Sequence, residues 1–322
     1  MINKERKKPL KVIKLEALIG RLPHNHPCKP NIEAELSKAL AGWRGEQAID
    51  YYLSFLPKEN YIILRDLRLE VSENRFFQID ALLLAQNQHL ILEVKNMAGT
   101  LYFNNEPQQL VQTINNEEKA YQCPILQVER QCQQLQTFFN KFTLPKAPIL
   151  RFVVISHSNA VIKFAPKFQK ARQCVIHSSA LPEKINAIQS ISNSEIISQK
   201  ELKKLARLLV KHNQPLNPDY LERYNISVSE LLTGVHCPNC GHLPMQRKRG
   251  LWFCPTCQHT SKDAHIAAIR DYWLLINSTI TNRQLRDFLH LPSNSVATKL
   301  LTSLGLKKYG ILRGSRYLLD KL

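Results

Sequence analysis

Residues 89–96 read HLILEVKN, an apolar, strand-like run that carries one acid, Glu93, and one base, Lys95. Successive side chains of a strand point to opposite faces, so Glu93 and Lys95 share one face. A carboxylate and an amine are therefore predicted to project together from a strand that is otherwise typical of a protein core. For this pattern alone, the ordinary alternative is a Glu/Lys pair on the surface of an edge strand.

Two further acids are predicted to lie near this pair. The preceding run, residues 76–85, reads FFQIDALLLA, and a short hairpin between Leu84 and Leu90 would bring Asp80 beside Glu93. Glu46 lies within residues 32–56, where apolar residues recur at the spacing of a helical stripe that faces a core. Because an unpaired buried carboxylate is costly, several converging acids predict a cation between them. Oxygen ligands favour Mg²⁺ or Mn²⁺.

This group of side chains suits the hydrolysis of phosphodiester bonds. Asp80 and Glu93 would hold Mg²⁺, which polarises the phosphoryl group and lowers the pKa of a bound water. Lys95 would orient that water or neutralise charge in the transition state. Glu46 would bind a second metal ion or orient a water on the first.

The segments around these residues predict an α/β domain that ends near residue 210. A helix is expected over residues 32–56, with a break at Gly42 and Gly45, and a second helix over residues 124–142. Strand-like runs occupy residues 61–71, 76–85, 89–95, 100–103, 149–156 and 174–177.

Four segments resemble the nuclease-related domain, NERD, of the PD-(D/E)xK, restriction-endonuclease-like class. They read GEQAIDYYLSFLP, YIILRDLRL, QIDALLLAQNQHLILEVKNMAGTLY and CPILQVERQCQQL, and the resemblance covers residues 40–156. It implies a mixed sheet flanked by helices, with Glu46, Asp80, Glu93 and Lys95 as the catalytic and metal-binding set. By the same resemblance, Gln127 is the polar residue that approaches the site from the following helix. A solvated helix face is the alternative for Gln127.

Composition predicts a polyanion as partner. The chain has 322 residues, 44% of them hydrophobic, and a formal net charge of +18. Clustered Lys and Arg gain free energy by releasing counterions from phosphates, so nucleic acid is favoured over an anionic membrane surface. Neither an apolar run long enough to cross a bilayer nor a signal peptide is found, which predicts a cytoplasmic protein without disulfides. No pattern predicts the oligomeric state.

Four of the eight cysteines form two C-x-x-C pairs, CPNC at residues 237–240 and CPTC at 254–257. Four thiolates with this spacing predict a tetrahedral Zn²⁺ site made by Cys237, Cys240, Cys254 and Cys257. The site resembles a zinc ribbon, and four protein ligands make the zinc structural. A redox dithiol, or ligation by His242 or His259, is the alternative. The basic turn between the pairs is expected to contact phosphate or simply to be solvated; its residues are Arg247, Lys248 and Arg249.

Residues 262–322 show three helical patterns followed by a hairpin, which resembles a winged helix-turn-helix. Thr281-Asn282 and Ser293-Asn294 are expected to cap the second and third helices. From residue 237 onward there are 13 Lys/Arg and only 4 Asp/Glu. Nucleic-acid binding is predicted for eight residues: Asn294, Ser295, Thr298, Lys299, Lys307, Lys308, Arg313 and Arg316. A helical protein-interaction module is the alternative for this segment.

The sequence thus predicts five parts: a basic, extended arm (1–30), a NERD-like nuclease domain (31–211), a linker (212–235), a zinc ribbon (236–261) and a winged-helix-like module (262–322). The predicted function is that of a Mg²⁺-dependent nuclease acting on nucleic acid, DNA rather than RNA. The alternative is a DNA-binding or adaptor protein whose endonuclease-like domain is catalytically silent.

Overall fold

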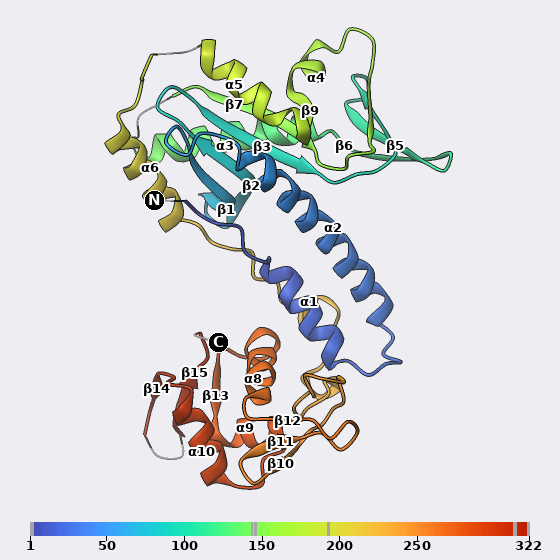
Figure 1. Cartoon of the computed structure of the whole chain (residues 1–322), viewed down its shortest axis with the longest axis vertical. Coiled ribbons are helices and arrows are strands. Elements are labelled where there is room, and N and C mark those ends of the chain that lie inside the picture. The colour runs from blue at the N-terminus through green and yellow to red at the C-terminus, as the bar shows by residue number, and fades with distance from the viewer. Residues whose placement is uncertain (1–2, 143, 145–146, 192–193, 312–313, 321–322) are drawn as a thin grey trace. The chain divides into compact units, whose positions relative to one another are not determined.

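The computed structural model describes residues 3–142, 144, 147–191, 194–311 and 314–320 (Figure 1). The chain divides into two compact units, the first made of Met1–Pro9 and Lys38–Leu216 and the second of Leu10–Ser37 and Asn217–Leu322. Within the described part of the chain, no helix has the length and apolar content needed to cross a membrane.

The first unit contains a five-stranded mixed sheet with the strand order β1-β2-β3-β7-β9. Strands β1, β2 and β3 pair antiparallel, while β3, β7 and β9 pair parallel. The bounds are β1 (Ile62–Ser72), β2 (Arg75–Leu84), β3 (His89–Lys95), β7 (Ile149–Ile155) and β9 (Val175–His177). The structure therefore confirms the predicted mixed α/β class, and it is consistent with a nuclease-like fold.

Helices cover both faces of this sheet because its central strands are apolar on both sides. Alternate residues of each strand pack either with α3 (Pro124–Lys141) and α6 (Gln199–Lys211) or with α2 (Lys29–Leu53) and α5 (Leu181–Ile191). In β3, Ile91 belongs to the first cluster, whereas Leu90, Leu92 and Val94 belong to the second. Helix α2 runs through Gly42 and Gly45 without the expected break.

A second sheet in this unit has four strands in the order β6-β5-β4-β8. Only β4 (Thr100–Asn104) was predicted, as residues 100–103. The other strands are β5 (Gln109–Ile114), β6 (Glu117–Gln122) and β8 (Val161–Phe164), and the short helices α4 (Gln169–Cys174) and η1 (Ser178–Ala180) complete the unit. Strand β6 is mostly exposed and polar, so its sequence has no apolar alternation to mark it.

The second unit combines two small three-stranded sheets with helices. The first sheet consists of β10 (Gln246–Lys248), β11 (Leu251–Phe253) and β12 (Thr260–Ser261). The second sheet has the order β13-β15-β14 and is made of β13 (Thr279–Thr281), β14 (Lys308–Tyr309) and β15 (Arg316–Leu318). Helix α8 (Ala264–Leu275) precedes it, and α9 (Asn282–Leu289) and α10 (Asn294–Ser303) lie between β13 and β14 in the chain. Thr281 and Ser293 cap α9 and α10 as predicted. Strand β13 was not predicted.

The N-terminal segment differs from the extended arm that its basic composition suggested. It contains helix α1 (Leu10–Arg21), which buries Val12, Leu15 and Leu18. The buried Arg21 guanidinium pairs with Asp271 at 2.9 Å. The apolar residues of α1 follow the helical spacing, so the extended-arm prediction was wrong because charge was given more weight than periodicity. The expected linker likewise contains α7 (Tyr220–Arg223) and η2 (Val228–Glu230).

Candidate nuclease site

Asp80 lies where the pairing of β2 is interrupted on both sides. The antiparallel β2–β3 register ends at Ala81↔Leu92, and continuing it by one residue places Asp80 opposite Glu93. Asp80 Oδ2 accepts a hydrogen bond of 2.8 Å from the backbone N–H of Val94. On the other side, β1 pairs with β2 at Arg65 and Leu67 but not at Asp66. Because β2 and β3 no longer pair at this point, the Val94 N–H donates to the Asp80 carboxylate instead of to a strand carbonyl.

Glu93 and Lys95 form an ion pair on one face of β3, and helix α3 completes their contacts. Lys95 Nζ lies 2.7 Å from Glu93 Oε1 and 2.9 Å from Gln127 Oε1. Gln131 Nε2 donates to Glu93 Oε2 at 2.6 Å. Gln127 and Gln131 are four residues apart, so they lie on the same face of α3. Glu93 is only 3% exposed, and both of its oxygens are hydrogen-bonded, which makes its burial tolerable.

Glu46 comes from α2 and contacts an arginine from the N-terminal segment. Glu46 Oε2 lies 2.5 Å from Arg6 Nη1, and Arg6 Nε donates to Asp50 Oδ2 at 2.8 Å. Arg6 Nη2 also donates to the backbone oxygen of Asp80 at 3.2 Å. Through Arg6, the helix that carries Glu46 is connected to the strand that carries Asp80.

The carboxylates are close enough to affect one another. Burial raises the pKa of Asp80 well above its ordinary value, and the negative charges of Glu93 and Glu46 raise it further. The Val94 N–H and the positive charge of Lys95 act in the opposite direction. A divalent cation would relieve this mutual repulsion.

The donors present fit a hard divalent ion in their chemistry, since Asp80, Glu93 and Glu46 offer carboxylate oxygens. The ligand atoms of these three carboxylates lie farther apart than the sulfur atoms of the four predicted cysteines. Among the described residues, those cysteines are the one set of three or more Cys, His, Asp or Glu whose ligand atoms all lie within 4.8 Å of one another.

Residues 41–156 match the model of the NERD family, described as nuclease-related domain. These matched residues are here called the NERD domain. The match agrees closely with the extent of 40–156 that the resemblance predicted. No curated protein and no solved structure matches the chain.

The NERD domain contains five of the predicted site residues: Glu46, Asp80, Glu93, Lys95 and Gln127. The structure brings Asp80, Glu93, Lys95 and Gln127 together by direct contacts and register, and Glu46 reaches the group through Arg6. Their catalytic and metal-binding roles stay predictions. A nuclease-related domain indicates nucleic acid as the general class of partner.

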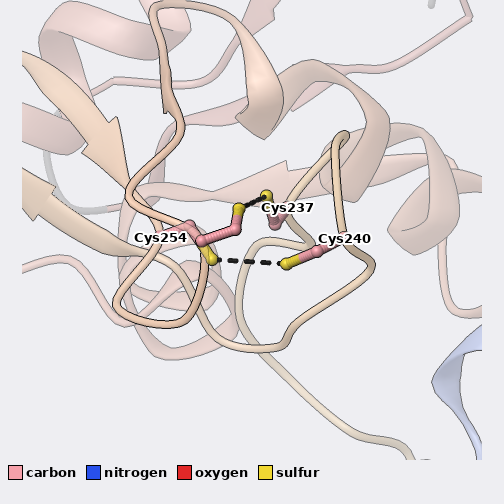
Figure 2. Close-up of side chains that lie close together, drawn as sticks. Cys237, Cys240 and Cys254 are labelled. Carbon is pink, nitrogen blue, oxygen red and sulfur yellow. Dashed lines mark hydrogen bonds between the residues drawn. The ribbon is translucent and has the colours of Figure 1, made fainter.

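Outside the NERD domain, the four predicted cysteines lie together in the second unit. Figure 2 labels three of them, Cys237, Cys240 and Cys254. Cys237 Sγ lies 3.6 Å from Cys257 Sγ, and Cys240 Sγ lies 3.5 Å from Cys254 Sγ. Zn–S bonds of about 2.3 Å with tetrahedral angles place sulfur atoms roughly 3.8 Å apart, so this cluster fits zinc closely. Hydrogen bonds from the Asn239 side chain and the His259 backbone lower the pKa of Cys257 to about 6, which favours the thiolate that binds a metal.

The residues predicted to bind nucleic acid are mostly exposed. On α10, Asn294, Ser295, Thr298 and Lys299 face solvent, and Asn282 from α9 donates to Thr298 Oγ1 at 2.9 Å. Lys307, Lys308 and Arg316 are exposed at the hairpin β14–β15, whereas Arg313 lies outside the described residues.

The three basic residues of the ribbon turn differ in their exposure to solvent. Lys248 and Arg249 are exposed, but Arg247 is partly buried, with its guanidinium 5.0 Å from the centre of the Trp252 ring. Arg247 therefore packs against the ribbon as well as carrying charge, a role that the sequence did not predict.

Three residues that contact the site were not predicted as part of it: Arg6, Asp50 and Gln131. Gln131 had a signal in the sequence, because it follows Gln127 by one helical turn. Asp50 likewise follows Glu46 by one turn of α2. Arg6 had no local signal, since it lies 40 residues from Glu46 in a segment of many basic residues.

Proposed function

We propose that this protein is a metal-dependent nuclease that hydrolyses phosphodiester bonds, with DNA as the favoured substrate. The main support is the arrangement where β2 and β3 cease to pair: Asp80 lies opposite Glu93, and Glu93 pairs with Lys95, within a segment that matches a nuclease-related domain. A cytoplasmic location goes with the proposal, because a reducing compartment keeps a four-cysteine metal site intact.

Asp80, Glu93 and Glu46 would hold Mg²⁺ or Mn²⁺. The bound ion supplies electrostatic stabilisation for the negative charge that develops on the phosphoryl group. Glu93 keeps its position through its contacts with Lys95 and Gln131. The carboxylate that would bind the ion is thus oriented before substrate arrives.

Lys95 is the candidate for direct contact with the scissile phosphate. Its side chain is 26% exposed, compared with 4% for that of Glu93, so the ammonium is the more accessible of the two charges. Glu93 Oε1 and Gln127 Oε1 hold the Nζ atom from two sides. From this position, Lys95 would neutralise transition-state charge or orient the attacking water.

The second unit would bind the polynucleotide. It carries the exposed polar face of α10 and a helix, helix, helix, hairpin order that resembles a winged helix-turn-helix. Such phosphate contacts lose affinity steeply as salt rises. The DNA preference depends on this part of the proposal.

The deciding experiment is incubation of single- and double-stranded DNA and RNA with Mg²⁺ or Mn²⁺. Wild type should cleave, whereas Asp80→Asn and Lys95→Met should lose activity by a factor of about 100 or more. Glu59→Gln and Lys58→Met make the same changes at exposed positions of the same unit and should cleave like wild type.

Equal cleavage by all five proteins would assign the activity to another site or to a contaminant. Binding of DNA by wild type with no metal-dependent cleavage would instead favour a silent endonuclease-like scaffold in a DNA-binding protein.

A further inference from the structure

Lys4 forms a single parallel bridge to Leu64 of β1. The Lys4 backbone N–H donates to Ile63 O at 3.3 Å, and the Arg65 N–H donates to Lys4 O at 3.1 Å. The Asn3 side chain accepts a hydrogen bond of 3.1 Å from the Ile63 N–H. Residues 3 and 4 are thereby fixed against the edge of the main sheet, within the first unit.

This segment runs along β1 beside the position where β1 and β2 do not pair. Asp66 has φ of 52°, in the left-handed region, and it interrupts the ladder at the position opposite Asp80. Lys4 Nζ donates to Arg65 O at 2.5 Å and to Asp66 O at 2.6 Å. Arg6 Nη2 donates to Asp80 O at 3.2 Å. Lys4 and Arg6 thus donate to three backbone carbonyls at or beside the interruption, those of Arg65, Asp66 and Asp80.

The Arg6 guanidinium also holds the acidic face of α2. Its side chain is 4% exposed and contacts both Glu46 and Asp50, which lie four residues apart on the helix. Like charges at this spacing repel one another. A second cation, Arg65, donates to Asp50 Oδ1 at 2.7 Å, so Arg6 remains available to orient Glu46.

We propose that Arg6 is a positioning residue of the nuclease site, which makes residues 3–6 part of the catalytic unit. The inference rests on the proposed function. Arg6 is too buried to contact substrate, and it acts by joining the Glu46 carboxylate to the strand of Asp80. A planar guanidinium can bind three acceptors at once, which an ammonium cannot do with the same geometry.

The test measures Mn²⁺ affinity of the full-length chain without nucleic acid, by the electron paramagnetic resonance signal of free Mn²⁺. Arg6→Gln should weaken Mn²⁺ binding by roughly tenfold or more, since loss of a group that orients a ligand typically costs about 10–100-fold in metal affinity. Arg6→Lys should give an intermediate affinity. Lys7→Gln removes a positive charge from the neighbouring exposed residue and should stay within about twofold of wild type. Thermal unfolding without added Mn²⁺ checks that each variant is folded.

Wild-type affinity in a folded Arg6→Gln variant would overturn the inference. Tighter binding would overturn it too, because Arg6 would then compete with the ion. If Arg6→Gln does not fold, Arg6→Lys decides: several-fold weaker binding supports the positioning role, and unchanged binding contradicts it.

The same measurements separate this inference from the proposed function. A wild-type protein that neither binds Mn²⁺ nor cleaves nucleic acid would contradict both the proposed function and the role of Arg6. If wild type binds Mn²⁺ and cleaves, and the Arg6 variants do the same, only the role of Arg6 is contradicted.

Discussion

Individual charged residues in this site are tolerated because each has partners of the right kind. Glu93 is nearly inaccessible to solvent, yet Lys95 and Gln131 donate to its two oxygens. Removing one partner of such a carboxylate costs more than the hydrogen bond itself contributes, because a buried acceptor is left without a donor. The site is therefore sensitive to changes in residues that touch neither metal nor substrate.

His89, at the start of β3, shows how burial of one titratable residue affects stability. It is 0% exposed and contacts Phe139 edge-on, with ring centres 5.8 Å apart. Burial lowers the pKa of His89 from 6.5 to about 4. Between these values the unfolded chain binds a proton that the folded chain does not, so the free energy of unfolding falls as pH falls through this range.

We predict that His89→Leu makes the unfolding of the first unit less dependent on pH. Between pH 7.5 and 5, this histidine should account for a loss of about 2 kcal/mol in wild type, at about 1.36 kcal/mol per pH unit below 6.5. Urea unfolding at the two pH values measures the difference. His24→Leu, at an exposed position, should behave like wild type. An undiminished pH effect in His89→Leu would contradict the prediction.

At the scale of elements, the approach of α2 to the sheet depends on a glycine. Gly45 precedes Glu46, and a Cβ at Gly45 would lie 2.4 Å from Asn96 Cβ and 2.7 Å from Ser156 Oγ. Asn96 and Ser156 directly follow β3 and β7. The helix can thus reach the ends of these strands only where it has no side chain.

We predict that Gly45→Ala lowers the free energy of unfolding by about 1–3 kcal/mol, because the new methyl group overpacks this contact. It should also reduce nuclease activity, since Glu46 moves with the helix. Gly42→Ala is the matched control in the same helix, where nothing lies within 4 Å of a new Cβ. That change should raise the free energy of unfolding by about 0.5–1 kcal/mol. Equal stability of the two variants in urea unfolding would show that the close approach has no energetic importance.

At the scale of the whole molecule, the ribbon and the helical module of the second unit share one hydrophobic cluster. It includes Cys237, Trp252 and Cys254 from the ribbon together with Ile269 and Leu285 from α8 and α9. Trp252 Nε1 donates to His265 Nδ1 at 3.1 Å, which joins β11 to α8. The predicted boundary at residues 261–262 therefore divides one continuous core. Loss of the metal should destabilise the helical module as well as the ribbon.

We predict that the chain binds about one Zn²⁺ and that Cys254→Ser abolishes this binding. The variant should lower the unfolding temperature of the second unit by on the order of 10 °C or more, since 1 kcal/mol corresponds to about 4 °C in a unit between 100 and 150 residues and loss of a structural metal costs several kcal/mol. Elemental analysis and calorimetry measure the two effects. Cys28→Ser, in the same unit but outside the cluster, should keep its zinc. A zinc-free wild type, or a Cys254→Ser variant with unchanged stability, would contradict the structural role.

Features whose cause lies within a few residues could be predicted from the amino-acid sequence. Alternation along residues 89–95 put Glu93 and Lys95 on one face, a short hairpin put Asp80 opposite Glu93, and the C-x-x-C spacing identified the cysteine cluster. Periodicity, turn length and ligand spacing are local properties, so one sequence is enough to read them.

Contacts between separate elements became known from the fold. Arg6 lies 74 residues from Asp80, and β13 pairs with β15 rather than with an adjacent strand. Such contacts depend on how separate elements pack. A single basic residue or a three-residue strand has no periodic pattern from which its partner could be predicted. For this reason the acids of the site were predicted, whereas the arginine that joins them was found only in the fold.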